Sequence, residues 1–104
     1  PQDAGMNDAP LSHAEIDAAV ADLAEWSRTG EQLRKVFSFA DFKSALAFMV
    51  RAGFEAESRD HHPEWTNVYN RVEVRLCTHS AGGKITEKDV DLAIAFDGVA
   101  AQFG

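Results

Sequence analysis

The sequence predicts an α+β fold in which helices cover one face of an antiparallel sheet. Two observations carry this prediction: helical periods of apolar residues begin at polar capping residues, and other short runs alternate as strands do. Helices of this length do not persist alone and need the sheet to bury their apolar side. The 104 residues, 45% of them apolar, fit one core. We expect a flexible segment over residues 1–10 and a single domain over residues 11–104.

The first helix is predicted to begin at Ser12. Ser12 and Glu15 have the spacing of a capping box, in which each side chain accepts a hydrogen bond from the backbone of the other residue. Apolar residues then recur at helical spacing and predict a buried stripe formed by Ile16, Ala19, Val20 and Leu23. The pattern ends near Trp26 and the turn at Thr29–Gly30.

A strand and a second helix follow. Residues 33–39 alternate along an apolar-rich run and predict a strand, paired through the turn at Gly30 with a short strand around Trp26. Asp41 can cap a helix that runs to about Ser58. The predicted buried face of this helix is formed by Phe42, Ala45, Leu46, Met49 and Ala52.

The second half of the chain begins with a polar loop over residues 60–65, because Pro63 disfavours helical angles at the preceding residue. Residues 68–77 alternate again and predict one long strand or a tight hairpin, with His79 near its end. After a loop over 80–84, Thr86 and Asp89 repeat the capping box and begin a third helix. The expected apolar residues of that helix are Leu92, Phe96, Val99 and Phe103.

Charge and hydropathy exclude several classes of function. The formal net charge is -7, and the 10 basic residues are scattered. Since basic residues supply most of the affinity for phosphates, we expect no direct contact with nucleic acid. No apolar stretch is long enough to span a membrane, and the first residues lack the pattern of a secretory leader. A single cysteine, Cys77, is typical of a reducing compartment, so we expect a cytoplasmic protein.

Three of the four histidines lie between positions 61 and 79, near an aromatic residue and three carboxylates. These residues are His61, His62, His79, Trp65, Glu57, Asp60 and Asp89. An imidazole can both give and take a proton near neutral pH, because its ordinary pKa is about 6.5. The cluster predicts acid–base catalysis in one pocket. The alternative interpretation places the histidines in an exposed turn and on a solvent-facing strand position. Asp89 is then only a helix cap.

Three other chemistries fit the sequence less well. Three imidazoles and a carboxylate could complete a zinc shell. However, Pro63 favours an extended backbone at His62, in which neighbouring side chains point apart, so we expect no metal site. Cys77 lies two residues before His79, but no further residue marks it as a nucleophile. Gly82–Gly83 is too short for a phosphate-binding loop and predicts a turn.

A longer pattern of residues carries a resemblance to a known family. The pattern is Glu57-x-x-x-His61-His62-Pro63-Glu64-Trp65, then Asn67-Val68-Tyr69-Asn70-x-Val72-x-Val74-x-Leu76-x-Thr78-His79, then Gly83, Ile85-Thr86 and Asp89. It resembles the signature of the pterin-4a-carbinolamine dehydratases. The similarity extends upstream through Phe37, Phe39 and Asp41-Phe42 to the first helix.

The resemblance implies a fold and an activity. The implied fold has three helices on one face of a four-stranded antiparallel sheet, in the order α-β-β-α-β-β-α, and assembles as a homodimer or homotetramer. The implied enzyme is a hydro-lyase that removes water from the 4a-hydroxytetrahydropterin released by aromatic amino acid hydroxylases. Its product is quinonoid dihydropterin, which enters tetrahydrobiopterin recycling, and it uses no metal or organic cofactor.

The resemblance also implies site residues. By position, the catalytic residues are His61, His62 and His79. The substrate contacts that match are Glu57, Asp60, His61, His62, Trp65, Cys77, Thr78, His79, Ser80 and Asp89. Our hypothesis is that His61 and His79 transfer protons and that His62 orients the pterin. Trp65 then excludes water, while Glu57 and Asp89 set imidazole tautomers or bind pterin nitrogens. The family varies at Cys77 and Ser80, and a relative can have arginine in place of Lys88.

The family also suggests two functions without turnover. Animal members stabilise dimers of a homeodomain transcription factor through a helix face, which makes a protein-interaction role the main alternative. A pterin-binding protein without catalysis is a further alternative. A pure interaction protein has no need of three histidines, so the sequence favours the enzyme.

Overall fold

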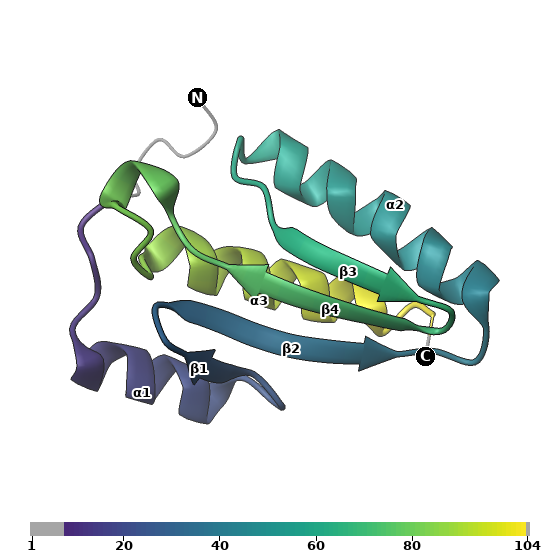
Figure 1. Ribbon diagram of the computed structural model, residues 1–104, viewed down its shortest axis with the longest axis horizontal. Coiled ribbons are helices and arrows are strands. Elements are labelled where there is room, and N and C mark those ends of the chain that lie inside the picture. The colour runs from purple at the N-terminus through teal and green to yellow at the C-terminus, as the bar shows by residue number, and fades with distance from the viewer. Residues whose placement is uncertain (1–7, 104) are drawn as a thin grey trace.

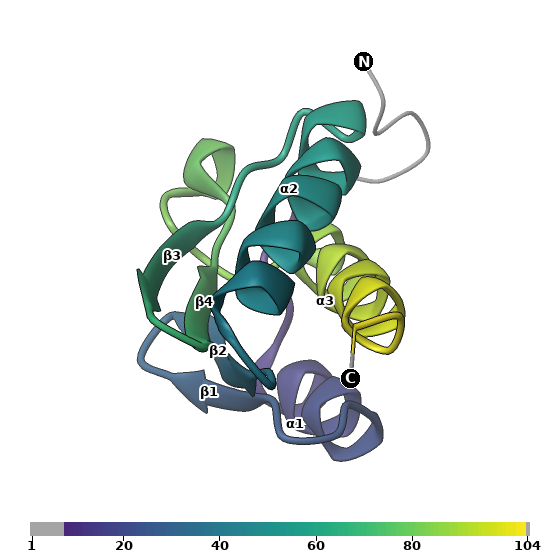
Figure 2. The same ribbon diagram turned by 90° about the vertical axis from the view of Figure 1, so that its right-hand side faces the viewer.

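The structure is a computed structural model and describes residues 8–103. Over these residues the elements follow the predicted order α-β-β-α-β-β-α. The helices are α1 (His13–Asp22), α2 (Phe42–Ser58) and α3 (Glu87–Ala100). The strands are β1 (Ser27–Thr29), β2 (Gln32–Ser38), β3 (Glu64–Val68) and β4 (Arg71–Leu76), and a 3-10 turn, η1 (His79–Ala81), follows β4. The strands form one layer and the helices form a second layer on one face of it (Figures 1 and 2), which confirms the predicted fold class.

The antiparallel sheet has the order β1-β2-β4-β3. Residues 64–76 form a hairpin, in which Glu64 pairs with Arg75 and Val68 with Arg71. The run predicted over 68–77 therefore holds the turn and the second strand of this hairpin, whereas most of the first strand lies before it. The chain reverses at Tyr69, whose φ of 51° lies in the left-handed region. The Asn67 side chain closes this turn by donating to the carbonyl oxygens of Tyr69 and Arg71. The loop predicted over 60–65 therefore ends at Pro63, because β3 already begins at Glu64.

Both predicted capping boxes are present. In α1 the Ser12 hydroxyl accepts from the Glu15 backbone, and the Glu15 carboxylate accepts from the Ser12 backbone N–H at 2.7 Å. In α3, Asp89 Oδ2 accepts from the Thr86 backbone N–H at 2.9 Å. Asp41 caps α2 by accepting from the Ser44 backbone N–H, and this hydrogen bond lowers the pKa of the Asp41 carboxyl.

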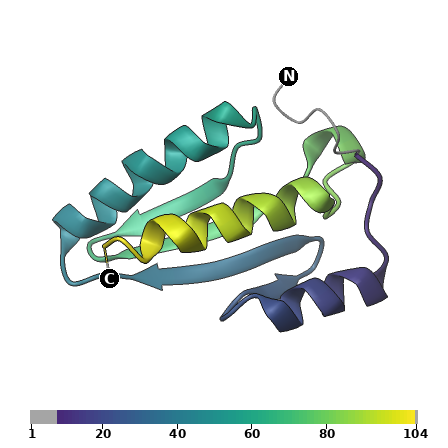
Figure 3. The ribbon, with the colours of Figure 1, turned by 180° about the vertical axis from the view of Figure 1, so that it is seen from behind.

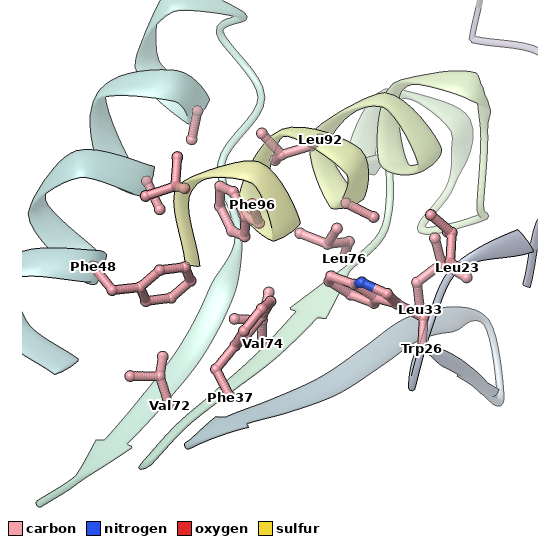
Figure 4. Close-up of a cluster of buried hydrophobic side chains, with 14 of the residues drawn as sticks. Leu23, Trp26, Leu33, Phe37, Phe48, Val72, Val74, Leu76, Leu92 and Phe96 are labelled. Atoms are coloured by element: carbon pink, nitrogen blue, oxygen red, sulfur yellow. The ribbon is translucent and has the colours of Figure 1, made fainter. Parts of the chain in front are cut away.

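The core fills the space between the sheet and the helices (Figure 4). Phe48 of α2 packs against Phe37 of β2, with ring centroids 4.7 Å apart, and against Phe96 of α3. Trp26 is also buried and donates its indole N–H to Asp97 at 3.0 Å. The buried residues of α1 and α3 include Ile16, Leu92, Phe96 and Val99, as their periods predicted. Within residues 8–103 no helix has the length and apolarity needed to cross a bilayer.

The predicted buried face of α2 is partly wrong. Ala45 and Ala52 are buried, but Phe42 and Leu46 are 44% and 47% exposed, and Phe48 lies inside instead. The helix carries two apolar stripes, so helical period alone could not choose between them. Small alanine side chains on the inner stripe let α2 lie close to α3 and the sheet. The other stripe, formed by Phe42, Leu46, Val50 and Phe54, faces solvent and is named the outer stripe below.

Candidate active site

The predicted site residues come together at one end of the molecule. Because β3 and β4 are antiparallel, the start of β3 lies beside the end of β4. The end of α2 and the start of α3 lie at the same end, next to η1 (Figure 3). Segments that are separated by up to 30 residues therefore contribute side chains to one region.

His61 is held inside the protein by the way α2 ends. The helix ends at Ser58, and Asp60 adopts a left-handed conformation with φ 50°, as residues after a helix often do. This reversal lets the His61 backbone N–H donate to the Ala56 carbonyl at 3.1 Å and turns the imidazole inward. His61 is 8% exposed, and its Nε2 lies 2.7 Å from Asp89 Oδ1.

The tautomer of His61 follows from its partner. A carboxylate can only accept hydrogen bonds, so Nε2 of His61 must carry the proton that joins it to Asp89. Nδ1 has no hydrogen-bond partner in residues 8–103, and none of their buried side-chain nitrogens or oxygens lacks one. Nδ1 is therefore open to solvent. It is the ring nitrogen that can exchange a proton with a bound molecule.

Asp89 makes the contacts that both of its predicted roles require. Its side chain is completely buried and accepts three hydrogen bonds. His61 Nε2 contacts Oδ1, whereas the Thr86 backbone N–H and the Thr78 hydroxyl, the latter at 2.8 Å, both donate to Oδ2. One carboxylate thus completes the cap of α3 and holds the imidazole.

The other two imidazoles are exposed. His62 Nε2 lies 2.8 Å from Glu57 Oε1, and His79 Nε2 lies 4.0 Å from Glu64 Oε2. The side chain of His79 is 77% exposed. The interpretation that placed the histidines on the surface therefore describes His62 and His79 but not His61. The proximity of Glu64 to His79 was not predicted from the sequence, because it depends on the pairing of β3 with the end of β4.

The remaining predicted contacts differ in how they present their side chains. Trp65 is half-buried and stacks on Phe96, with ring centroids 5.9 Å apart, so it packs against the core. Asp60 is exposed. The hydroxyl of Thr78 already has two partners inside the protein. Burial raises the pKa of the Cys77 thiol, which disfavours the nucleophilic thiolate form.

Asp8 lies at the same end of the molecule and was not predicted as a site residue. Its carboxylate accepts from the Ser80 hydroxyl at 2.5 Å and from Lys88 Nζ at 2.6 Å. The hydrogen bond from Lys88 lowers the pKa of the Asp8 carboxyl. Asp8 belongs to the segment predicted to be flexible, of which residues 1–7 lie outside the described part of the chain. No apolar period marks it, so sequence reasoning had no signal for these contacts.

The arrangement of side chains suits proton transfer. It contains one buried imidazole–carboxylate pair and two exposed pairs, each with a separate carboxylate. In the part of the chain that the structure describes, no three side chains of His, Cys, Asp or Glu come together as a metal ion would require. The expected lack of a metal remains a prediction for experiment.

Comparisons with known proteins all find similarity to the same family. A family model described as pterin 4 alpha carbinolamine dehydratase matches residues 9–99. A protein of Opitutus terrae, provisionally named pterin-4-alpha-carbinolamine dehydratase, is 52% identical over 84% of this chain and 90% of its own length. A protein of Nitrobacter hamburgensis with the same provisional name is 50% identical over 90% of this chain and 94% of its own.

A solved structure extends the comparison to the fold. The crystal structure of a protein from Brucella melitensis, described as a transcriptional coactivator/pterin dehydratase, matches with a TM-score of 0.85 and 39% sequence identity. The match covers 88% of this chain and 99% of that one.

Proposed function

The chain belongs to the pterin-4a-carbinolamine dehydratase family of hydro-lyases, and from this premise we propose that it converts 4a-hydroxytetrahydropterin to quinonoid dihydropterin by histidine acid–base catalysis. The observation that carries the proposal is the buried pair of His61 and Asp89, which leaves one ring nitrogen open to a ligand. A site that only bound pterin would not need an imidazole fixed in one tautomer.

The reaction needs two proton transfers. One proton must reach the departing 4a-hydroxyl, so that the C–O bond breaks and water leaves with the bonding electrons. The other must leave the adjacent ring nitrogen, whose electrons then form the new double bond. His61 suits the role of base: Nδ1 takes up the proton, and the Asp89 carboxylate stabilises the imidazolium that forms.

The exposed histidines complete the proposed mechanism. His79 lies at the surface, where it can deliver a proton to the departing hydroxyl and regain one from solvent. His62, held by Glu57, orients the pterin ring. Trp65 shields the site from water on the side of the core. We propose that the enzyme is cytoplasmic and that its product passes to reductive recycling. The recycled pterin would then serve an aromatic amino acid hydroxylase.

An absorbance assay tests the proposed function. Freshly generated 4a-hydroxytetrahydropterin should lose water faster with catalytic amounts of the protein than in buffer alone, and prior treatment with a chelator should leave the rate unchanged. An unaccelerated reaction would refute the enzyme and leave pterin binding or an interaction role. Activity that disappears on chelation and returns with zinc would refute the metal-free mechanism.

A second function, as a protein-interaction module, is favoured by the outer stripe of α2. Its four large apolar side chains are each at least 44% exposed, and a shallow groove runs beside them, lined by Lys43, Leu46, Ala47, Val50, Arg51 and Phe54. Contiguous apolar patches of this kind usually mark contact surfaces. The relative from Brucella melitensis is described as a transcriptional coactivator as well as a dehydratase. Such a role would be compatible with catalysis, because the outer stripe contains none of the predicted site residues.

We predict that this surface makes the chain a homodimer or homotetramer. A symmetric contact between copies would remove the outer stripe from water. Light scattering at micromolar concentration should therefore give a mass above the 11.4 kDa of one chain. Phe54→Lys should lower that mass, because it places a charge in the contact, whereas Ile94→Lys, at an exposed position of α3, should not. A monomeric wild-type protein would contradict the prediction.

A further inference from the structure

We propose that the hydroxyl groups of Thr78 and Thr86 form a relay that fixes the Asp89 carboxylate and, through it, the tautomer and orientation of His61. Both threonines are positioning residues for the dehydration, so this inference rests on the proposed function. The sequence pattern presented Thr86 only as a helix cap and Thr78 only as a substrate contact.

The relay is a continuous chain of short contacts in the interior. Thr78 is 2% exposed, and Thr86 and Asp89 are completely buried. The two threonine hydroxyls lie 2.7 Å apart, and the Thr78 hydroxyl lies 2.8 Å from Asp89 Oδ2. The Thr86 hydroxyl also accepts from the Lys88 backbone N–H at 3.2 Å. The relay therefore runs from the first turn of α3 to the carboxylate that holds His61.

Counting protons fixes the direction of every hydrogen bond in the relay. The Thr78 hydroxyl has one proton, and it goes to Asp89, because the carboxylate can only accept. Thr86 must therefore donate its own proton to Thr78. The Lys88 backbone N–H in turn donates to the Thr86 hydroxyl. Both hydroxyl protons of the relay are therefore used in hydrogen bonds, so each hydroxyl group is held in one rotational orientation.

This direction shows what Thr86 does beyond capping. A helix cap needs only an oxygen that accepts from the backbone, which serine, threonine, aspartate and asparagine all supply. The donation from Thr86 to Thr78 requires a hydroxyl proton, which an aspartate cap lacks. Hydrogen bonds in such chains polarise one another, so the donor upstream strengthens the contact between Thr78 and Asp89.

The relay also explains how the carboxylate stays aimed at His61. Oδ1 contacts the imidazole, while the Thr86 backbone N–H and the Thr78 hydroxyl anchor Oδ2. Without the Thr78 donor, one backbone bond alone would resist rotation of the carboxylate. His61 would then lose its fixed partner. The expected result is a slower chemical step with little change in substrate binding, because both hydroxyls are buried and have their partners inside the protein.

The test compares Thr78→Val and Thr86→Val, which keep the shape of the side chain but remove the hydroxyl, with Thr86→Ser, which keeps the hydroxyl. Each valine variant should lower kcat by about 10-fold, the scale for losing an outer partner of a functional imidazole, with KM unchanged. The serine variant should keep most of the wild-type rate. Ser12→Ala is the matched control, because it removes the equivalent cap of α1, remote from the site, and should leave kcat unchanged.

A spectroscopic measurement on the free protein keeps the inference independent of turnover. Side-chain ¹H–¹⁵N correlation spectra should show neutral His61 with its proton on Nε2 in the wild-type protein and in Ser12→Ala. In both valine variants that proton should exchange faster with solvent, and the Nδ1-protonated form should appear.

The outcomes separate this inference from the proposed function. If the wild-type protein does not accelerate dehydration, the proposed function fails and the spectra alone decide whether the relay sets the tautomer. If the wild-type protein is active and both valine variants match Ser12→Ala in kcat and in the His61 signals, the relay is refuted. If Thr86→Val does not fold, Thr78→Val decides, because it leaves the α3 cap in place.

Discussion

Replacing His61 with alanine is expected to lower kcat by about 100-fold or more, the usual scale for losing a general base. Among the imidazoles of the site in residues 8–103, only His61 has a buried carboxylate as its partner. Steady-state kinetics would measure the loss. His79→Ala should lower kcat as well, whereas His62→Ala should mainly raise KM, because His62 is assigned to orienting the substrate.

The alanine variant has a structural cost that needs a control. Without His61, Oδ1 of the buried Asp89 loses its partner, which costs about 1 to 3 kcal/mol of stability. Circular dichroism must therefore show that the variant is folded at the assay temperature. His61→Gln is the matched variant, because its amide can donate to Asp89 but cannot take up a proton. A glutamine variant that turns over at the wild-type rate would show that His61 is not the base.

Replacing Asp89 with asparagine is expected to lower kcat/KM by at least about tenfold, equivalent to roughly 1.4 kcal/mol of transition-state stabilisation. The asparagine oxygen can take the place of Oδ2 and keep the contacts of Thr86 and Thr78. The amide nitrogen then faces His61 Nε2 as a donor, so the ring must carry its proton on Nδ1 instead. The open nitrogen can no longer act as a base, which is the physical reason for the loss.

The melting temperature separates the two roles of Asp89. Since the cap survives in Asp89→Asn, the loss of charge near the start of α3 should cost only about 0.5 to 1 kcal/mol. Glu15→Gln makes the same exchange in the capping box of α1 and should lower stability by a similar amount without any change in kinetics. Wild-type kinetics in Asp89→Asn, with a lowered melting temperature, would reduce Asp89 to a helix cap.

The features that the sequence predicted well are those set by near neighbours. The capping boxes at Ser12 and Thr86 join residues three apart, and their spacing is visible in the sequence. The inner face of α2 was partly mistaken because both stripes of that helix are apolar, and only packing against α3 and the sheet selects one. The hairpin turn at Tyr69 was left open because it has no glycine to mark it.

The candidate site also combines features that the sequence predicted with contacts that only the fold creates. The family signature predicted that the histidines gather, but the pairing of His61 with Asp89 spans 28 residues and depends on three segments meeting. Helical and strand periods carry no information about such contacts. The same applies to Glu64 beside His79 and to Asp8 beside Lys88, which follow from the sheet register and from the course of the chain after Asp8.

The burial of Asp89 has a consequence for how the enzyme matures during synthesis. The ribosome adds Asp89 after α2 and all four strands have been made, so His61 waits without its partner until the last helix has formed. A nascent chain that ends before Thr86 also lacks the hydroxyl and backbone N–H of that residue, which hold the carboxylate. Under the mechanism proposed above, competence for catalysis therefore arises in one step, when the final helix docks, and partly made chains are expected to be inactive.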